Sequence, residues 1–155
     1  MTPIPYTLYP RGQMIMSKEK IKVITAKIGT DGHYRGIEAV TRALRDAGME
    51  VIYLGAGRRV EEVVTAVIQE DADVLGLSFL CGGHMQAMRR VMARVKEENL
   101  GHVLVVVGGI IYDDEIPEMK ELGVAEVFLP GTPLKQGVAD YVSREVEKRR
   151  AFSEK

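Results

Sequence analysis

The sequence predicts a doubly wound α/β domain, in which helices cover both faces of a five-stranded parallel sheet. Five short runs rich in Val, Ile and Leu alternate along the chain with five segments of helical periodicity. Continuous apolar runs of this length are typical of strands that are buried on both faces of a parallel sheet. Strands that alternate with helices favour right-handed crossover connections. The 155 residues suffice for one such domain.

The elements follow in chain order from this alternation. We expect strands at residues 21–26, 50–54, 73–78, 102–107 and 125–129. We expect helices at about residues 34–47, 60–70, 83–99, 113–122 and 134–150. Gly48, Gly101 and Gly123 each follow one of these helices, where a left-handed terminal residue favours glycine. Five strand–helix units in a chain of this length most resemble the flavodoxin-like (Rossmann-like) strand order 2-1-3-4-5.

The two ends of the chain fall outside this pattern. Residues 1–19 hold three of the six prolines and show no apolar period. They predict an extended or disordered arm, or a segment that orders against a partner. We therefore divide the chain into an arm at residues 1–19, a domain at residues 20–150 and a tail at residues 151–155.

Composition excludes several classes of protein. The formal net charge of −1 gives no electrostatic reason to expect binding to nucleic acid or to an anionic membrane. No apolar run approaches the roughly 20 residues that cross a bilayer, and the N-terminus lacks a signal-peptide pattern. The single cysteine, Cys81, rules out an internal disulfide and fits a reducing cytosol. We expect a soluble, cytoplasmic protein.

The expected strand order locates the functional site. The first and third strands become neighbours whose connections leave in opposite directions, which opens a crevice at their carboxyl ends. Ligands of such sheets bind in that crevice. The loops that follow the first, third, fourth and fifth strands are therefore the candidates for binding.

The loop after the first strand carries Lys27, Asp31 and His33. One interpretation is a glycine-rich turn with Asp31 as a helix cap and an incidental histidine. The other is a metal ligand, because a metal-bound histidine usually donates its second ring N–H to a carboxylate. A lone histidine cannot form a zinc site, which typically needs three or four protein ligands. It suits a metal that brings most of its own ligands, such as haem or a corrinoid.

The other loops at this edge are rich in small residues. Ser78, Gly82 and Gly83 follow the third strand, Gly108 and Gly109 follow the fourth, and Gly131 and Thr132 follow the fifth. Each group is weak evidence alone, because turns contain glycine for many reasons. Together, beside His33, they predict one elongated slot for a bulky ligand.

Three motifs in this order resemble a known signature. They are Asp31-x-His33-x-x-Gly36, Ser78-x-Leu80 and Gly108-Gly109. They are similar to the cobalamin-binding domain of methylmalonyl-CoA mutase and its relatives, over about residues 20–150. The string from Ala26 to His33 looks closer to the acyl-CoA mutase branch than to glutamate mutase. Phe79 and Cys81 depart from the loop Ser-Ser-Leu-Ala-Ala-Gly-His that is common in this branch.

The resemblance implies a cofactor and a role for each loop. Adenosylcobalamin would bind with its dimethylbenzimidazole displaced, and His33 would be the lower axial ligand of the cobalt. Asp31 and Lys27 would tune this ligand, Gly36 would allow close helix approach, and Ser78 would hydrogen-bond the benzimidazole. No catalytic residue is implied in this chain. The implied cofactor-binding residues are Asp31, Gly32, His33, Tyr34, Arg35, Gly36, Ser78, Leu80, Gly82, Gly108, Gly109, Gly131 and Thr132.

The resemblance also implies a partner. A TIM barrel that binds acyl-CoA takes about 250 residues, more than this chain contains. We expect a hetero-oligomer in which this chain is the cofactor-binding subunit of an isomerase and a large TIM-barrel mutase subunit binds the acyl-CoA. A corrinoid carrier for methyl transfer or cofactor delivery is the alternative. A receiver-like signalling domain is disfavoured, because Lys27 and Ser78 stand where receivers need acidic residues.

Overall fold

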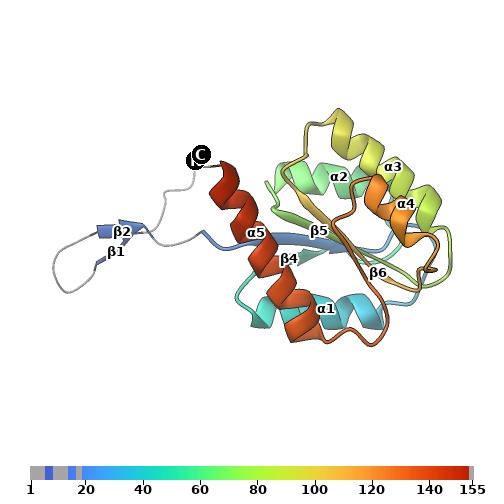
Figure 1. The fold of residues 1–155 in the computed structure, drawn as a ribbon, viewed down its shortest axis with the longest axis horizontal. Helices are drawn as coiled ribbons and strands as arrows, with labels where there is room; N and C mark the ends of the chain where they lie inside the picture. The colour runs from blue at the N-terminus through green and yellow to red at the C-terminus, as the bar shows by residue number, and fades with distance from the viewer. Residues whose placement is uncertain (1–5, 9–13, 17–18, 154–155) are drawn as a thin grey trace.

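A parallel sheet organises the structure, a computed structural model that describes residues 6–8, 14–16 and 19–153. The five strands of this sheet lie in the order β4-β3-β5-β6-β7. Counted in sequence within the sheet, this is the expected order 2-1-3-4-5, and all neighbouring pairs are parallel. The predicted flavodoxin-like fold class is confirmed (Figure 1).

The strands coincide with the apolar runs of the sequence. They are β3 (Lys22–Ala26), β4 (Glu50–Tyr53), β5 (Val74–Phe79), β6 (Leu104–Gly109) and β7 (Glu126–Phe128). All six residues of the central strand β5 are buried, as expected for a strand covered on both faces. Alternate residues of a strand point to opposite faces, so each run supplies two layers of core.

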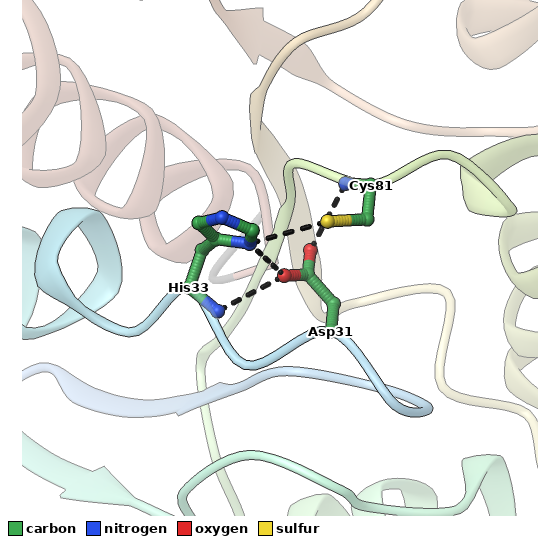
Figure 2. Close-up of side chains that lie close together, drawn as sticks. All are labelled: Asp31, His33 and Cys81. Atoms are coloured by element: carbon green, nitrogen blue, oxygen red, sulfur yellow. Dashed lines mark hydrogen bonds and ion pairs between the residues drawn. The ribbon is translucent and has the colours of Figure 1, made fainter.

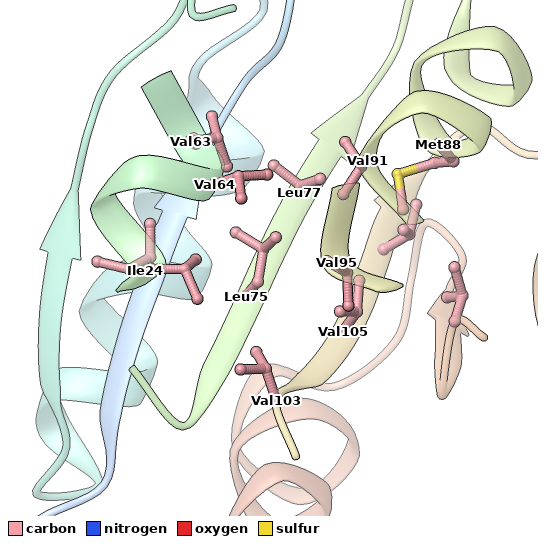
Figure 3. Close-up of a cluster of buried hydrophobic side chains, with 14 of the residues drawn as sticks. Ile24, Val63, Val64, Leu75, Leu77, Met88, Val91, Val95, Val103 and Val105 are labelled. Carbon is pink, nitrogen blue, oxygen red and sulfur yellow. The ribbon is translucent and has the colours of Figure 1, made fainter. Parts of the chain in front are cut away.

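The helices divide between the two faces of the sheet. They are α1 (Arg35–Asp46), α2 (Val60–Gln69), α3 (His84–Glu97), α4 (Ile116–Glu121) and α5 (Asp140–Ser153). One core cluster joins the sheet to α2, α3 and α4 and includes Leu75, Leu77 and Met88 (Figure 3). The other joins it to α1 and α5 and includes Leu44, Val74 and Val142.

Three helix ends differ from the sequence expectation. Helix α4 begins only at Ile116, with Pro117 in its first turn, where a missing N–H costs nothing. After α3 the left-handed residue is Asn99, with φ 56°, rather than Gly101. The expected helix at residues 134–150 is split into a π-helical turn, η1 (Leu134–Ala139), and α5. In that turn the N–H groups of Gly137 and Val138 both donate to the carbonyl of Pro133.

The N-terminal segment contains a short antiparallel pair. Strand β1 (Tyr6–Leu8) pairs with β2 (Met14–Met16), so Tyr6 lies opposite Met16. The rest of the expected arm, at residues 1–5, 9–13 and 17–18, lies outside the described residues, as do residues 154–155 of the expected tail. Helix α5 continues through residues 151–153 of that tail. The contact of the arm with a partner stays a prediction.

In the described part of the chain, no helix combines the length and the apolar character that crossing a bilayer requires.

Candidate functional site

A cavity of about 470 Å³ opens at the carboxyl edge of the sheet, on the side of α1, η1 and α5. Its wall is largely apolar and includes Val40, Val106 and Val142. Seven of the predicted cofactor-binding residues line it: Gly36, Ser78, Leu80, Gly108, Gly109, Gly131 and Thr132. The structure therefore brings together the small residues of four separate loops, as the predicted slot requires.

The remaining predicted residues lie beside this cavity rather than on its wall. They are Asp31, Gly32, His33, Tyr34, Arg35 and Gly82. A hydrogen bond attaches the loop of residues 31–35 to the cavity wall, because the backbone N–H of Leu80 donates to Oδ2 of Asp31 at 2.7 Å. The loop that carries His33 is thereby bonded to Leu80 of the cavity wall.

The buried side chain of Lys27 holds the loop of residues 31–35 in place. The Lys27 side chain is 0% exposed, and its Nζ lies 3.1 Å from Oδ2 of Asp31. Nζ also donates to the backbone carbonyl of Ser78 at 3.1 Å. A buried ammonium is stable only when it is paired and hydrogen-bonded, and these two contacts meet that need.

Both carboxylate oxygens of Asp31 accept hydrogen bonds. Oδ2 accepts from Lys27 and from the backbone N–H groups of Leu80 and Cys81, and Oδ1 accepts the backbone N–H of His33. Burial opposes ionisation of this carboxyl, but the hydrogen bonds from His33, Leu80 and Lys27 outweigh it and hold the pKa of Asp31 well below its usual range. The carboxylate is therefore charged at neutral pH.

The imidazole of His33 is oriented by that carboxylate. Nδ1 of His33 lies 2.9 Å from Oδ1 of Asp31, and the two side chains face each other in Figure 2. A charged carboxylate favours the tautomer whose proton sits on Nδ1, which leaves the lone pair on Nε2. The side chain is 62% exposed, so Nε2 is accessible to a metal that arrives from outside.

Cys81 is a neighbour of His33 that the sequence patterns do not reveal. Sγ of Cys81 lies 3.2 Å from Nδ1 of His33, although the two residues are 48 positions apart. The histidine that stands alone in its own loop therefore has a cysteine beside it in the folded chain. The strand order could have indicated this contact, because Cys81 follows β5, and β5 pairs directly with β3.

Two of the glycines line the cavity for different reasons. Gly36 was expected to allow close approach of the helix, but a Cβ built there would meet no heavy atom within 4 Å. Gly36 instead lines the cavity, with open space where a Cβ would lie. Gly109, in contrast, has φ +123°, and a Cβ there would lie 1.8 Å from the carbonyl oxygen of Phe79.

We expect the substitution Gly109→Ala to lower the free energy of unfolding by about 2–4 kcal/mol, because backbone strain and a steric clash act together. Urea-induced unfolding measures this loss. The matched control is Gly57→Ala, at φ +73° with nothing within 4 Å, which retains only the backbone strain. Equal losses for the two variants would show that the clash with Phe79 contributes nothing.

The chain also resembles known proteins. The B12 binding domain family model matches residues 21–139. The chain is 43% identical over 136 residues to the 2-hydroxyisobutanoyl-CoA mutase small subunit of Aquincola tertiaricarbonis, which covers 88% of this chain and 99% of that one. It is 40% identical over 131 residues to the pivalyl-CoA mutase small subunit of Xanthobacter autotrophicus, which covers 84% of this chain and 87% of that one.

A solved structure shares the fold. The cobalamin-binding protein from Desulfitobacterium hafniense superposes with a TM-score of 0.68 at 21% identity, over 84% of this chain and 60% of that one. At that identity the likeness concerns the fold alone, and membership rests on the family model and on the two small subunits. The chain belongs to the B12-binding domain family, and its relatives there include small subunits of acyl-CoA mutases.

Proposed function

We propose that this chain is the cobalamin-binding small subunit of an adenosylcobalamin-dependent acyl-CoA mutase. It holds the cofactor in the base-off form, with Nε2 of His33 as the lower axial ligand of the cobalt. The observation that carries the proposal is the Asp31–His33 hydrogen bond of 2.9 Å beside an apolar cavity of about 470 Å³. An imidazole that Asp31 orients through Nδ1 presents Nε2 to a metal that brings its other ligands, and the cavity fits a displaced aromatic base.

Each residue of the site has a defined task in this proposal. Asp31 keeps the proton of His33 on Nδ1, and Lys27 keeps Asp31 charged. Ser78 lines the cavity, where its hydroxyl can bond a nitrogen of the benzimidazole, and Gly108 leaves room for the ring. When bound, adenosylcobalamin supplies the radical that initiates rearrangement of the carbon skeleton. The protein contributes placement of the cofactor and tuning of the axial ligand.

The proposal includes a second chain. The two relatives described above are named small subunits, which supports a separate large subunit. In this proposal the large subunit binds the acyl-CoA in a TIM barrel. The complex would work in the cytoplasm. Isomerase activity that requires both chains would support this assignment, whereas methyl transfer without isomerisation would favour a corrinoid carrier.

The axial-ligand claim is tested by mixing the purified chain with adenosylcobalamin and recording its absorption spectrum. We expect the wild-type chain to displace the dimethylbenzimidazole and His33→Ala to abolish that displacement, because alanine offers no lone pair to the cobalt. The matched control is His102→Ala, an exposed histidine just before β6, which we expect to behave like the wild type. An unchanged spectrum for His33→Ala would contradict the claim.

A further inference from the structure

Three potential metal ligands meet at the loops after β3 and β5. One potential ligand atom from each of Asp31, His33 and Cys81 lies within 4.8 Å of the other two (Figure 2). Nδ1 is 2.9 Å from Oδ1 and 3.2 Å from Sγ. His33 and Cys81 are exposed, so an ion in solution can reach the cluster. This cluster uses Nδ1, whereas the proposed cobalt ligation uses Nε2.

The spacing of these atoms is close to that of a zinc site. Zinc bonds of about 2.0–2.3 Å in a tetrahedral arrangement separate nitrogen from oxygen by roughly 3.4 Å and nitrogen from sulfur by roughly 3.6 Å. The observed separations of 2.9 and 3.2 Å therefore need to widen by only a few tenths of an ångström. The three ligands come from loops, which can adjust by that amount more easily than a helix or strand.

The charges around the cluster also permit a cation. Lys27 and Asp31 neutralise each other, and Lys27 holds Oδ2, which leaves Oδ1 for the metal. The third potential ligand is the exposed thiol of Cys81. A bound metal would displace the thiol proton to solvent and take the thiolate as a ligand.

We propose that the cofactor-free chain binds one zinc ion through Nδ1 of His33, Sγ of Cys81 and Oδ1 of Asp31, with water as the fourth ligand. Imidazole, thiolate and carboxylate are the ligand groups that bind zinc in proteins. Three such ligands leave the fourth position of the tetrahedron open for water. The site arises from Cys81, which departs from the sequence common in the acyl-CoA mutase branch.

Zinc in this site would oppose loading of the cofactor. The ion replaces the hydrogen bond from Nδ1 of His33 to Asp31, which is the contact that aims Nε2 at the cobalt. The imidazole therefore serves either the zinc ion or the corrin, and the two compete. This competition rests on the proposed function, whereas binding of zinc to the cofactor-free chain does not.

The zinc site is tested on the cofactor-free chain after treatment with a chelator. Aqueous Co²⁺ serves as the spectroscopic probe, and we expect a thiolate-to-metal charge-transfer band at one ion per chain that added Zn²⁺ removes. Cys81→Ser and His33→Ala should each abolish the band, and His102→Ala should leave it unchanged. No band, or a band that survives His33→Ala, would overturn the proposal, because the latter would mark binding to the thiol alone.

The competition is tested by adding cobalamin to the zinc-loaded chain. We expect zinc to suppress the base-off spectrum, a chelator to restore it, and Cys81→Ser to give the base-off spectrum with or without zinc. Base-off binding that saturating zinc leaves unchanged would overturn the competition. A chain that binds cobalamin but no zinc refutes only this inference, whereas one that binds zinc but no cobalamin refutes the proposed function.

Discussion

Asp31→Asn is expected to lower the free energy of unfolding at pH 7 by about 3–5 kcal/mol, the usual cost of breaking a buried ion pair from one side. The substitution leaves the ammonium of Lys27, which is 0% exposed, without its counter-charge. It also weakens the acceptor for the backbone N–H groups of Leu80 and His33. Urea-induced unfolding, followed by circular dichroism, measures the loss.

Two further variants isolate the buried charge as the cause. The double variant Lys27→Met with Asp31→Asn removes both charges, and we expect it to recover part of the lost stability. Asp73→Asn breaks the pair between Arg150 and Asp73, whose side chains are 32% and 30% exposed, and should cost at most about 1 kcal/mol. If Asp31→Asn costs no more than Asp73→Asn, the pair of Lys27 and Asp31 does not hold the loop.

The same carboxylate makes stability depend on pH. The pKa of Asp31 is lowered in the folded chain, whereas in the unfolded chain it is about 3.9. A lowered pKa means that the stabilisation is fully present above the unfolded value and is lost as the pH falls toward the folded one. The difference in stability between the wild type and Asp31→Asn should therefore be largest at neutral pH and should shrink on acidification below about pH 4.

Gly108→Leu is expected to weaken cobalamin binding while the fold persists. Leu104 and Val106 of β6 point to the face covered by α1 and α5, and Gly108 continues that face into the cavity. A Cβ there would meet only the carbonyl of Phe128, at an ordinary 3.6 Å. Overpacking against the ligand costs about 1–3 kcal/mol, so we expect affinity to fall by up to roughly 100-fold.

The measurement is a cobalamin titration paired with a thermal melt. The matched control is Gly101→Leu, an exposed glycine before β6 where a Cβ meets nothing within 4 Å, and we expect it to retain both binding and stability. Wild-type affinity in Gly108→Leu, with an unchanged melting temperature, would show that the cavity does not receive the benzimidazole.

The contacts within the loop after β3 were predictable because its parts are close in sequence. Lys27, Asp31 and His33 fall within one strand-to-helix connection, and the structure joins them by contacts of 3.1 and 2.9 Å. A carboxylate two residues from a histidine needs no long-range information to be recognised as a possible partner. The roles of the more distant residues could only be inferred from the resemblance.

The role of Gly36 could not be predicted from the sequence, because a glycine can be required for several structural reasons. A glycine can permit a left-handed backbone, a close approach of two elements or an open cavity wall. Gly36 meets no neighbour and lines the cavity, whereas Gly109 lines the cavity and also meets the backbone of Phe79. Only the position of the neighbouring strand in the folded chain distinguishes these cases.

By itself, the sequence determined the parallel sheet, the order of its strands and the loop that presents His33. These features follow from local periodicity and from the chirality of crossover connections, which act over one strand–helix unit at a time. The tertiary structure alone decided that Cys81 lies 3.2 Å from the histidine and that small residues of four loops line one cavity. Those contacts join segments up to about a hundred residues apart. Their distances are set by the pairing of β3 with β5, of β5 with β6 and of β6 with β7.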